Sequence, residues 1–187
     1  MSDTTDKPDT STHDASDPAH LWVSWDEYHR AIESLAIKIH ASGWHFDQVL
    51  CLARGGLRPG DVFSRLFKVP LAVLSTSSYR HAAGTVQGEL EIGNHITSTA
   101  GPLAGKILLV DDLVDSGITL QQVQQHLRTH CPLVTEVRSA VIWYKAVSVE
   151  RPDYYLEYLP DSPWIHQPFE TYDTLTPANL GTLNAAP

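Results

Sequence analysis

The stretch from Ile107 to Leu120 reads ILLVDDLVDSGITL, and it decides the fold class. Its apolar start, residues 107–110, predicts a strand buried on both faces, as in a parallel sheet. Successive side chains of a strand point to opposite faces. Asp111 and Asp112, at the end of this strand, can therefore address two different groups, such as a metal ion and a sugar hydroxyl.

The second half of the stretch predicts a turn into a helix. The turn contains a third carboxylate, hydroxyls and a glycine: Asp115, Ser116, Gly117, Ile118 and Thr119. Free N–H groups and the positive end of a helix dipole at such a turn suit a phosphate. An Asp-Asp pair alone is usually a solvated loop or a helix cap. The complete pattern is more specific, and it indicates a site for a phosphorylated sugar with a divalent metal ion nearby.

Composition limits the class of protein. The chain has 187 residues, of which 42% are hydrophobic and 19% charged, which is typical of one globular domain with extra ends. No apolar run approaches the ~20 residues of a membrane span, and no secretory signal is visible. The two cysteines, Cys51 and Cys131, are expected to be reduced structural thiols in a cytoplasmic protein.

Charge argues against nucleic-acid or membrane partners. The net charge is −9; five Asp and one Lys give residues 1–20 a charge of −4, and Asp173 adds −1, so residues 21–170 carry −4. A mildly acidic body does not favour polyanionic partners. We expect a disordered acidic tail over 1–20, one domain over 21–172 and a C-terminal extension over 173–187.

Strand and helix patterns alternate along the domain. Ser24-Trp-Asp-Glu27 is a capping box that opens a helix ending near Gly43, and Pro59 suits the first turn of a second helix that buries Val62, Phe63 and Leu66. Strands are expected at 48–53, 71–75, 107–110, 137–144 and 154–159. The fold class is therefore α/β, with a central, mainly parallel sheet flanked by helices and a site at the carboxyl ends of the strands. Residues 80–104 are too long for an ordinary connection and predict a flexible lid loop or a loose hairpin.

Further candidate site residues follow other strands. Arg54 and the glycines after it can bind phosphate oxygens, although Gly-Gly is often only a tight turn. Ser78 and Tyr79 lie at the root of the expected lid, and Lys145 follows an apolar strand. Trp164 is either a core residue or a plane for a flat ring. The histidines show no zinc-binding spacing, and the carboxylates favour Mg²⁺.

In chain order, these pieces resemble the type I purine phosphoribosyltransferases of the bacterial xanthine-guanine and hypoxanthine group. The resemblance covers 21–170 and includes Ala-Arg-Gly-Gly, Ser-Ser-Tyr, Asp-Asp-Leu-Val-Asp-Ser-Gly, a strand-end Lys and Trp-Ile-x-Gln-Pro. It implies the type I phosphoribosyltransferase fold, with a small base-binding hood. It also implies transfer of a phosphoribosyl group from phosphoribosyl pyrophosphate (PRPP) to N9 of hypoxanthine, guanine or xanthine in purine salvage, with Mg²⁺, in a homodimer or homotetramer.

The resemblance also implies a role for each matching residue. Asp111 and Asp112 would hold the ribose hydroxyls and, with Glu170, metal ions, and Asp115 would act as general acid/base at N7. The turn from Asp115 to Thr119, including Ser116, Gly117 and Ile118, would bind the 5′-phosphate. Pyrophosphate would lie at Ala53, Arg54 and Gly55, where the family often has a cis peptide bond. The purine would contact Lys145, Trp164, Ile165 and His166.

One position departs from the family pattern, and two rival functions stay open. An acid follows Trp-Ile in the xanthine-guanine group, whereas this chain has His166, so the preferred 6-oxopurine is open. One rival is a regulator that senses PRPP or a nucleotide on the same fold. The other is phosphoribosyl transfer to a non-purine acceptor.

Overall fold

The computed structural model describes residues 19–80, 87–93 and 95–184. Its strands are β1 (His20–Trp22), β2 (Gln48–Ala53), β3 (Leu71–Arg80), β4 (Gln87–Ile92), β5 (Thr97–Ser98), β6 (Gly105–Val110), β7 (Leu113–Val114), β8 (Val134–Lys145), β9 (Tyr154–Leu159) and β10 (Trp164–His166). Its helices are α1 (Trp25–Ala41), α2 (Leu57–Phe67), α3 (Ile118–His130), the 3-10 helix η1 (Glu170–Asp173) and α4 (Pro177–Asn184). The expected elements are all present, and β3 and β8 are longer than expected.

The main sheet is mostly parallel, as the sequence predicted. Its strand order is β4-β3-β2-β6-β8-β7, and β5 and β9 pair with β3 and β8. The pairs formed by β2, β6, β8 and β9 are parallel, whereas β4 and β5 run antiparallel to β3. The carboxyl ends of β2, β6 and β8 therefore lie side by side, which brings three of the predicted site segments together.

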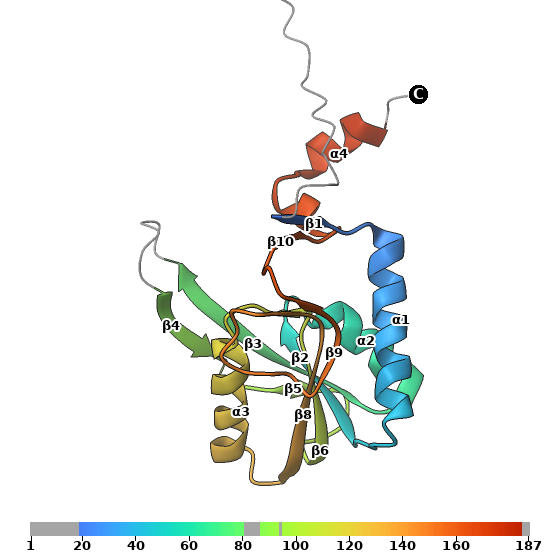
Figure 1. Cartoon of the computed structure of the whole chain (residues 1–187). Coiled ribbons are helices and arrows are strands. Elements are labelled where there is room, and N and C mark those ends of the chain that lie inside the picture. Colours follow the sequence, from blue (N-terminus) through green and yellow to red (C-terminus); the bar gives the residue numbers. More distant parts are fainter. Residues whose placement is uncertain (1–18, 81–86, 94, 185–187) are drawn as a thin grey trace, which may run out of the picture.

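Helices cover both faces of this sheet (Figure 1). On β6, Leu108 and Val110 pack in one apolar cluster with residues of α1 and α2, whereas Ile107 and Leu109 pack in a second cluster with residues of α3. This alternation is the two-face burial expected of a parallel strand. None of the described helices is both long and apolar enough to cross a bilayer.

The N-terminal cap of α1 forms as the sequence predicts, whereas the buried face of α2 differs from the prediction. Ser24 forms both hydrogen bonds of the capping box with Glu27. Leu66, expected to be buried, is 57% exposed, and Val62 is only partly buried, because α2 buries the face that carries Pro59, Gly60 and Phe63. Cys51 and Cys131 are both free thiols.

The region expected to form a lid is an antiparallel hairpin of β3 and β4. Residues 81–86, at its tip, lie outside the described residues, as do the side chains of Ser78 and Tyr79. Tail residues 1–18 also lie outside the described part. His20, which we had placed in the tail, is instead the first residue of β1.

A small second sheet lies above the main one (Figure 1). It pairs β1 in parallel with β10, so that His20, Leu21 and Trp22 lie opposite Trp164, Ile165 and His166. With η1 and α4, this sheet forms the hood. Residues 173–187, expected as an extension, include the end of η1 and α4.

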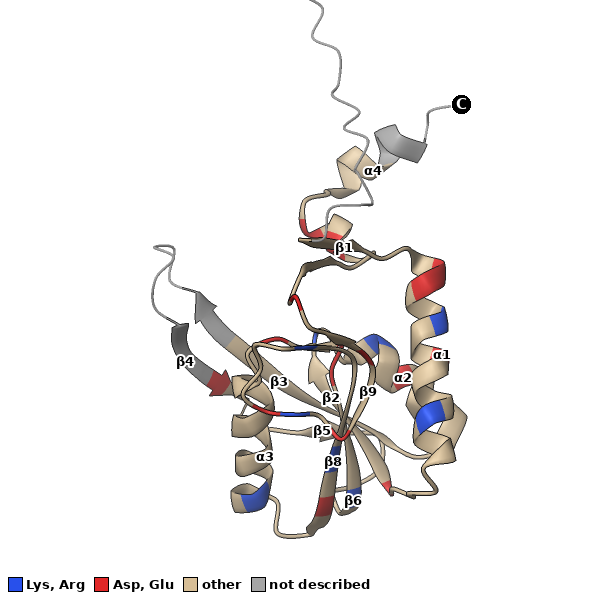
Figure 2. Ribbon diagram, viewed as in Figure 1, with Lys and Arg blue, Asp and Glu red and all other residues tan. Residues whose placement is uncertain are grey.

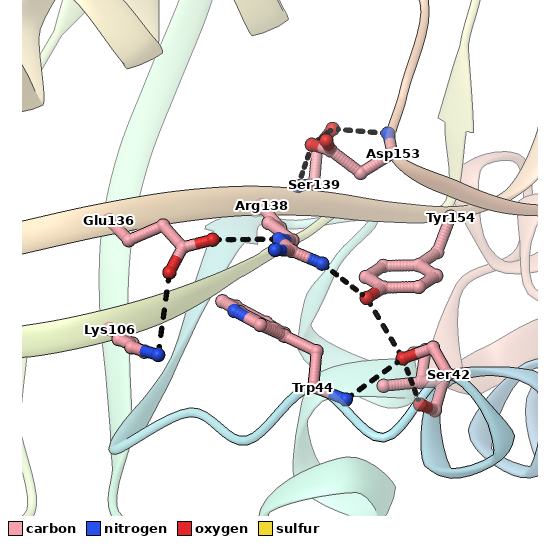
Figure 3. Close-up of polar contacts among 9 residues, drawn as sticks. Ser42, Trp44, Lys106, Glu136, Arg138, Ser139, Asp153 and Tyr154 are labelled. Atoms are coloured by element: carbon pink, nitrogen blue, oxygen red, sulfur yellow. Dashed lines mark hydrogen bonds and ion pairs between the residues drawn. The ribbon is translucent and has the colours of Figure 1, made fainter.

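A polar network joins the end of α1 to β8 and β9, away from the carboxyl ends of the strands (Figure 3). The Arg138 guanidinium donates to Glu136 at 2.8 Å and to the Tyr154 hydroxyl at 3.2 Å, and it lies 4.6 Å from the centre of the Trp44 ring. Lys106 Nζ lies 3.6 Å from Glu136 Oε2. The network fixes this end of the sheet, and it supplies control positions remote from the site.

Candidate active site

A cavity of about 290 Å³ opens at the carboxyl ends of the central strands. The predicted site residues that line it are Asp111, Asp115, Ser116, Gly117, Thr119, Lys145, Trp164, Ile165 and Glu170. The others lie beside it or face elsewhere: Ala53, Arg54, Gly55, Asp112, Ile118 and His166. Segments far apart in the sequence thus meet around one cavity.

Asp111 and Asp112 diverge at the end of β6. The Asp112 amide donates to Asp111 Oδ1 at 3.0 Å. The Asp112 carboxylate accepts from the Leu113 amide at 2.8 Å and from Gln167 Nε2 at 2.5 Å. Burial raises the pKa of both carboxyls; the charge of Asp112 raises the pKa of Asp111 further, whereas the bonds from Gln167 and Leu113 oppose the rise at Asp112.

The turn before α3 has the geometry of an anion-binding loop. Gly117 has a φ of +80°, and a Cβ there would lie 2.7 Å from the Glu150 amide nitrogen, so this position requires glycine. The Val149 amide donates to the Ser116 carbonyl at 2.9 Å and holds the turn against the loop after β8. The first amides of α3 have no partners within the helix, and the Ile118 amide donates to Ser116 Oγ at 3.4 Å.

Lys145 and Asp115 form an ion pair inside the cavity. Lys145, the last residue of β8, is only 6% exposed, and its Nζ lies 3.3 Å from Asp115 Oδ1. A buried ammonium has three donors. One faces Asp115, and no other described residue pairs with Lys145 Nζ, so two donors are left for an acceptor in the cavity.

The loop after β2 approaches the acid pair closely. A Cβ on Gly55 would lie 2.8 Å from Asp111 Oδ1 and still closer to Asp112 Oδ1, so only glycine fits. The Ala53–Arg54 peptide bond is cis. Arg54 is exposed, and its guanidinium lies 3.5 Å from Asp173 Oδ1.

The hood places Trp164 and His166 differently. Trp164 is 55% exposed and lines the cavity, and Ile165 is buried beneath it. The His166 ring instead stacks on Trp22, with ring centres 3.6 Å apart and planes within 4°. His166 Nε2 also lies 2.8 Å from His20 Nδ1. The sequence patterns did not reveal that β1 would hold His166.

Glu170 lines the cavity from η1. Burial raises its pKa, and the charges of Asp112 and Asp173 add to this rise. Among the described residues, no group of three or more His, Cys, Asp or Glu side chains is arranged to hold a metal ion. Mg²⁺ is commonly held by only one or two carboxylates, with water and phosphate oxygens completing its shell.

Two residues beside Asp112 had no assigned role in the sequence analysis. Gln167 belongs to the Trp-Ile-x-Gln-Pro segment, but nothing in its sequence neighbourhood indicates contact with Asp112, 55 residues earlier. Tyr28 fits the apolar stripe of α1 and is fully buried. Only the fold reveals that both lie behind the acid pair.

Comparison with known proteins identifies the family of the chain. The family model described as the phosphoribosyl transferase domain matches residues 24–174. A xanthine-guanine phosphoribosyltransferase from Idiomarina loihiensis is 27% identical over 153 residues, which cover 81% of this chain and 88% of that relative.

Solved structures show the same fold. A purine phosphoribosyltransferase from Pyrococcus horikoshii superposes with a TM-score of 0.66 at 28% identity, covering 81% of this chain and 94% of that one. The xanthine-guanine-hypoxanthine phosphoribosyltransferase of Helicobacter pylori gives a TM-score of 0.68 at 24% identity, covering 89% of this chain and 99% of that one.

Proposed function

Because the chain belongs to the phosphoribosyltransferase family, and is thus a pentosyltransferase, we propose that it transfers the phosphoribosyl group of PRPP to N9 of a 6-oxopurine. The products are the nucleoside monophosphate and pyrophosphate. The observation that carries the proposal is the Lys145–Asp115 pair inside the cavity. O6 and N7 are adjacent on one edge of a 6-oxopurine, so an ammonium beside a carboxylate matches this edge.

The cavity supports separate subsites for the two substrates. The turn from Asp115 to Thr119 offers amides and hydroxyls to the 5′-phosphate, and Asp111 offers a carboxylate to the ribose hydroxyls. Trp164 presents an aromatic plane on which a purine can stack. The base would thus lie between the hood and Lys145, with its N9 directed toward the sugar.

Magnesium fits the acidic residues near the pyrophosphate loop. Asp111, Asp112 and Glu170 offer only oxygen ligands, which Mg²⁺ prefers, and a magnesium ion shared with PRPP needs few protein ligands. When bound, Mg²⁺ neutralises charge on the pyrophosphate group. Arg54, beside Gly55 on the same loop, can bind the leaving group if PRPP displaces Asp173 from its guanidinium.

Different residues would transfer the proton, bind the base and exclude water. Asp115 accepts the proton from N7 while N9 bonds to C1′ of the sugar and pyrophosphate leaves. Lys145 donates to O6 and holds the purine in register, and the β3–β4 hairpin would serve to exclude water from the reacting sugar. A homodimer or homotetramer and a cytoplasmic location stay predictions.

The test is nucleotide formation from isotopic PRPP and Mg²⁺ with a panel of bases. We expect product with at least one of hypoxanthine, guanine and xanthine. Product only with a pyrimidine or another acceptor would replace the purine assignment. PRPP binding without consumption of any base would favour a sensor of PRPP.

A further inference from the structure

Two buried polar groups that interact with Asp112 each have an atom without a hydrogen-bond partner in the described part of the chain: the Gln167 amide donates to Asp112, and the charge of Asp112 acts on Tyr28. Within the described residues, neither the Tyr28 hydroxyl nor Gln167 Oε1 has a partner. Buried polar groups in proteins are nearly always paired with protein groups or ordered water. Two such groups beside one functional carboxylate therefore suggest a role for them.

The two acids that follow β6 have different surroundings. Leu109 faces α3, and Asp111, two residues later, lines the cavity. Val110 packs in the cluster that contains Tyr28, and Gln167 donates to Asp112. The charge of Asp112 adds to burial in raising the pKa of Tyr28.

The neighbouring residues fix one oxygen of Asp112 and direct the other. Gln167 Nε2 donates to Oδ2 at 2.5 Å, and the Leu113 amide donates to Oδ1 at 2.8 Å. Gly55, in the pyrophosphate loop, lies so close to Oδ1 that a Cβ there would collide with it. Gln167 therefore holds Asp112 with Oδ1 toward the pyrophosphate side.

Tyr28 supports this arrangement from α1. Its ring stacks on Trp143 at 6.1 Å and meets Phe169 edge-on at 5.5 Å, two residues beyond Gln167. The Trp143 and Ile142 amides both donate to the Asp112 carbonyl, at 3.2 and 2.9 Å. Tyr28 thus contacts Trp143, whose amide binds the Asp112 carbonyl, and Phe169, in the segment that carries Gln167.

We propose that Gln167 and Tyr28 are positioning residues for PRPP, acting through Asp112, with the Tyr28 hydroxyl linked to Gln167 Oε1 by one buried water molecule. The chain Tyr28–water–Gln167–Asp112 fixes the carboxylate in the orientation that Mg²⁺-PRPP requires. It also ties the hood, through Gln167 just after β10, to the sugar subsite. The proposal rests on the proposed function.

The test compares Gln167→Met, Tyr28→Phe and the double variant by calorimetric binding of Mg²⁺-PRPP and by KM for each substrate. Outer partners of metal-site carboxylates typically affect affinity by roughly tenfold or more. We expect Gln167→Met to weaken PRPP binding by about this factor, with the KM of the base nearly unchanged. Tyr28→Phe, which removes one oxygen atom, should weaken PRPP binding several-fold, and the double variant should resemble Gln167→Met because the two residues act in one chain.

Gln48→Met is the matched control. Gln48 is also buried, its side-chain amide donates to the Pro102 carbonyl at 3.2 Å, and its Oε1 has no partner among the described residues. Unlike Gln167, it lies at the start of β2, whereas the pyrophosphate loop follows the end of that strand. The control should lower the melting temperature and leave PRPP affinity unchanged. A merely structural role for Gln167 would produce the same result as Gln48→Met.

The outcomes separate the inference from the proposed function. Wild-type PRPP affinity in Gln167→Met or in Tyr28→Phe would overturn the positioning chain alone. Fully additive effects in the double variant would overturn the link between the two residues. A wild-type protein that binds no PRPP would overturn the proposed function and this inference with it.

Discussion

Lys145 Nζ lies 3.3 Å from Asp115 Oδ1, and the two residues come from different walls of the cavity. Lys145 ends β8, whereas Asp115 belongs to the turn that leads into α3. Lys145 is almost fully buried, but 62% of the Asp115 side chain is exposed. The pair therefore presents a fixed donor and an accessible carboxylate to the same ligand edge, and this arrangement underlies the first two predictions.

Replacing Lys145 with Met should impair use of the purine and spare PRPP. A hydrogen bond from a charged group contributes about 1.5–3 kcal/mol, so the KM of the base should rise by roughly 10- to 100-fold. Lys106→Met is the control, because Lys106 belongs to the remote network of Figure 3. An unchanged KM for the base in Lys145→Met would contradict its assigned role.

Asp115→Asn should lower kcat and keep PRPP binding. The amide has the shape of the carboxylate but cannot take up the N7 proton. General acid/base groups typically contribute about 10²- to 10⁴-fold, which sets the expected loss in kcat. Single-turnover rates with saturating PRPP measure this loss directly, and turnover near the wild-type value would exclude Asp115 as the proton carrier.

Trp164→Ala should weaken base binding through loss of stacking. An aromatic side chain stacked on a base contributes about 1–3 kcal/mol, so the KM of the purine should rise, with little change in melting temperature because the ring is half-exposed. Trp164→Phe retains an aromatic plane and should give an intermediate KM. Equal values for the two variants would argue against stacking.

The buried acids predict opposite effects of pH on stability and on ligand binding. Asp111 and Asp112 have pKa values raised above 3.8, so between 3.8 and the raised values the folded state holds protons that the unfolded state has released. The free energy of unfolding of the ligand-free protein should therefore fall as pH rises through this window. Affinity for Mg²⁺-PRPP should rise over the same window, because the ionised carboxylates are the binding forms.

Melting curves at several pH values, with and without Mg²⁺-PRPP, measure both trends. Asp111→Asn removes one of the titrating groups, so it should flatten the pH dependence of the ligand-free protein. An identical slope in wild type and Asp111→Asn would show that the group does not titrate differently on folding.

Local sequence patterns were sufficient for much of the fold. The burial of β6 on both faces and the capping box at Ser24 depend on residues close together in the chain. Both are present as expected. The strand-end positions of Arg54 and Lys145 follow from the parallel sheet. The mostly parallel topology brought these strand ends to one edge, as predicted.

Contacts between distant segments could not be predicted from such patterns. The β1–β10 pair joins His20 to His166, 146 residues apart, and places the His166 ring against Trp22. Neither short strand has a distinctive periodicity. The bond from Gln167 to Asp112 likewise depends on how the hood meets the sheet, and the role of His166 at the base stays a prediction.

Figure 2 shows basic residues scattered among acidic ones on the described elements. A mixed distribution of this kind, in a chain of net charge −9, does not favour a polyanionic partner. It does not weaken the enzyme assignment, because the anionic substrate would bind through amides, Arg54 and a metal ion.

The most direct test of the central claim is nucleotide formation from PRPP with hypoxanthine, guanine, xanthine and adenine in separate reactions. The account predicts a nucleoside monophosphate and stoichiometric pyrophosphate with at least one 6-oxopurine. Adenine has no acceptor at C6 for Lys145, and should be rejected by a factor on the order of 10⁴. Adenine used as well as the best 6-oxopurine, or no nucleotide from any of the four bases, would contradict it.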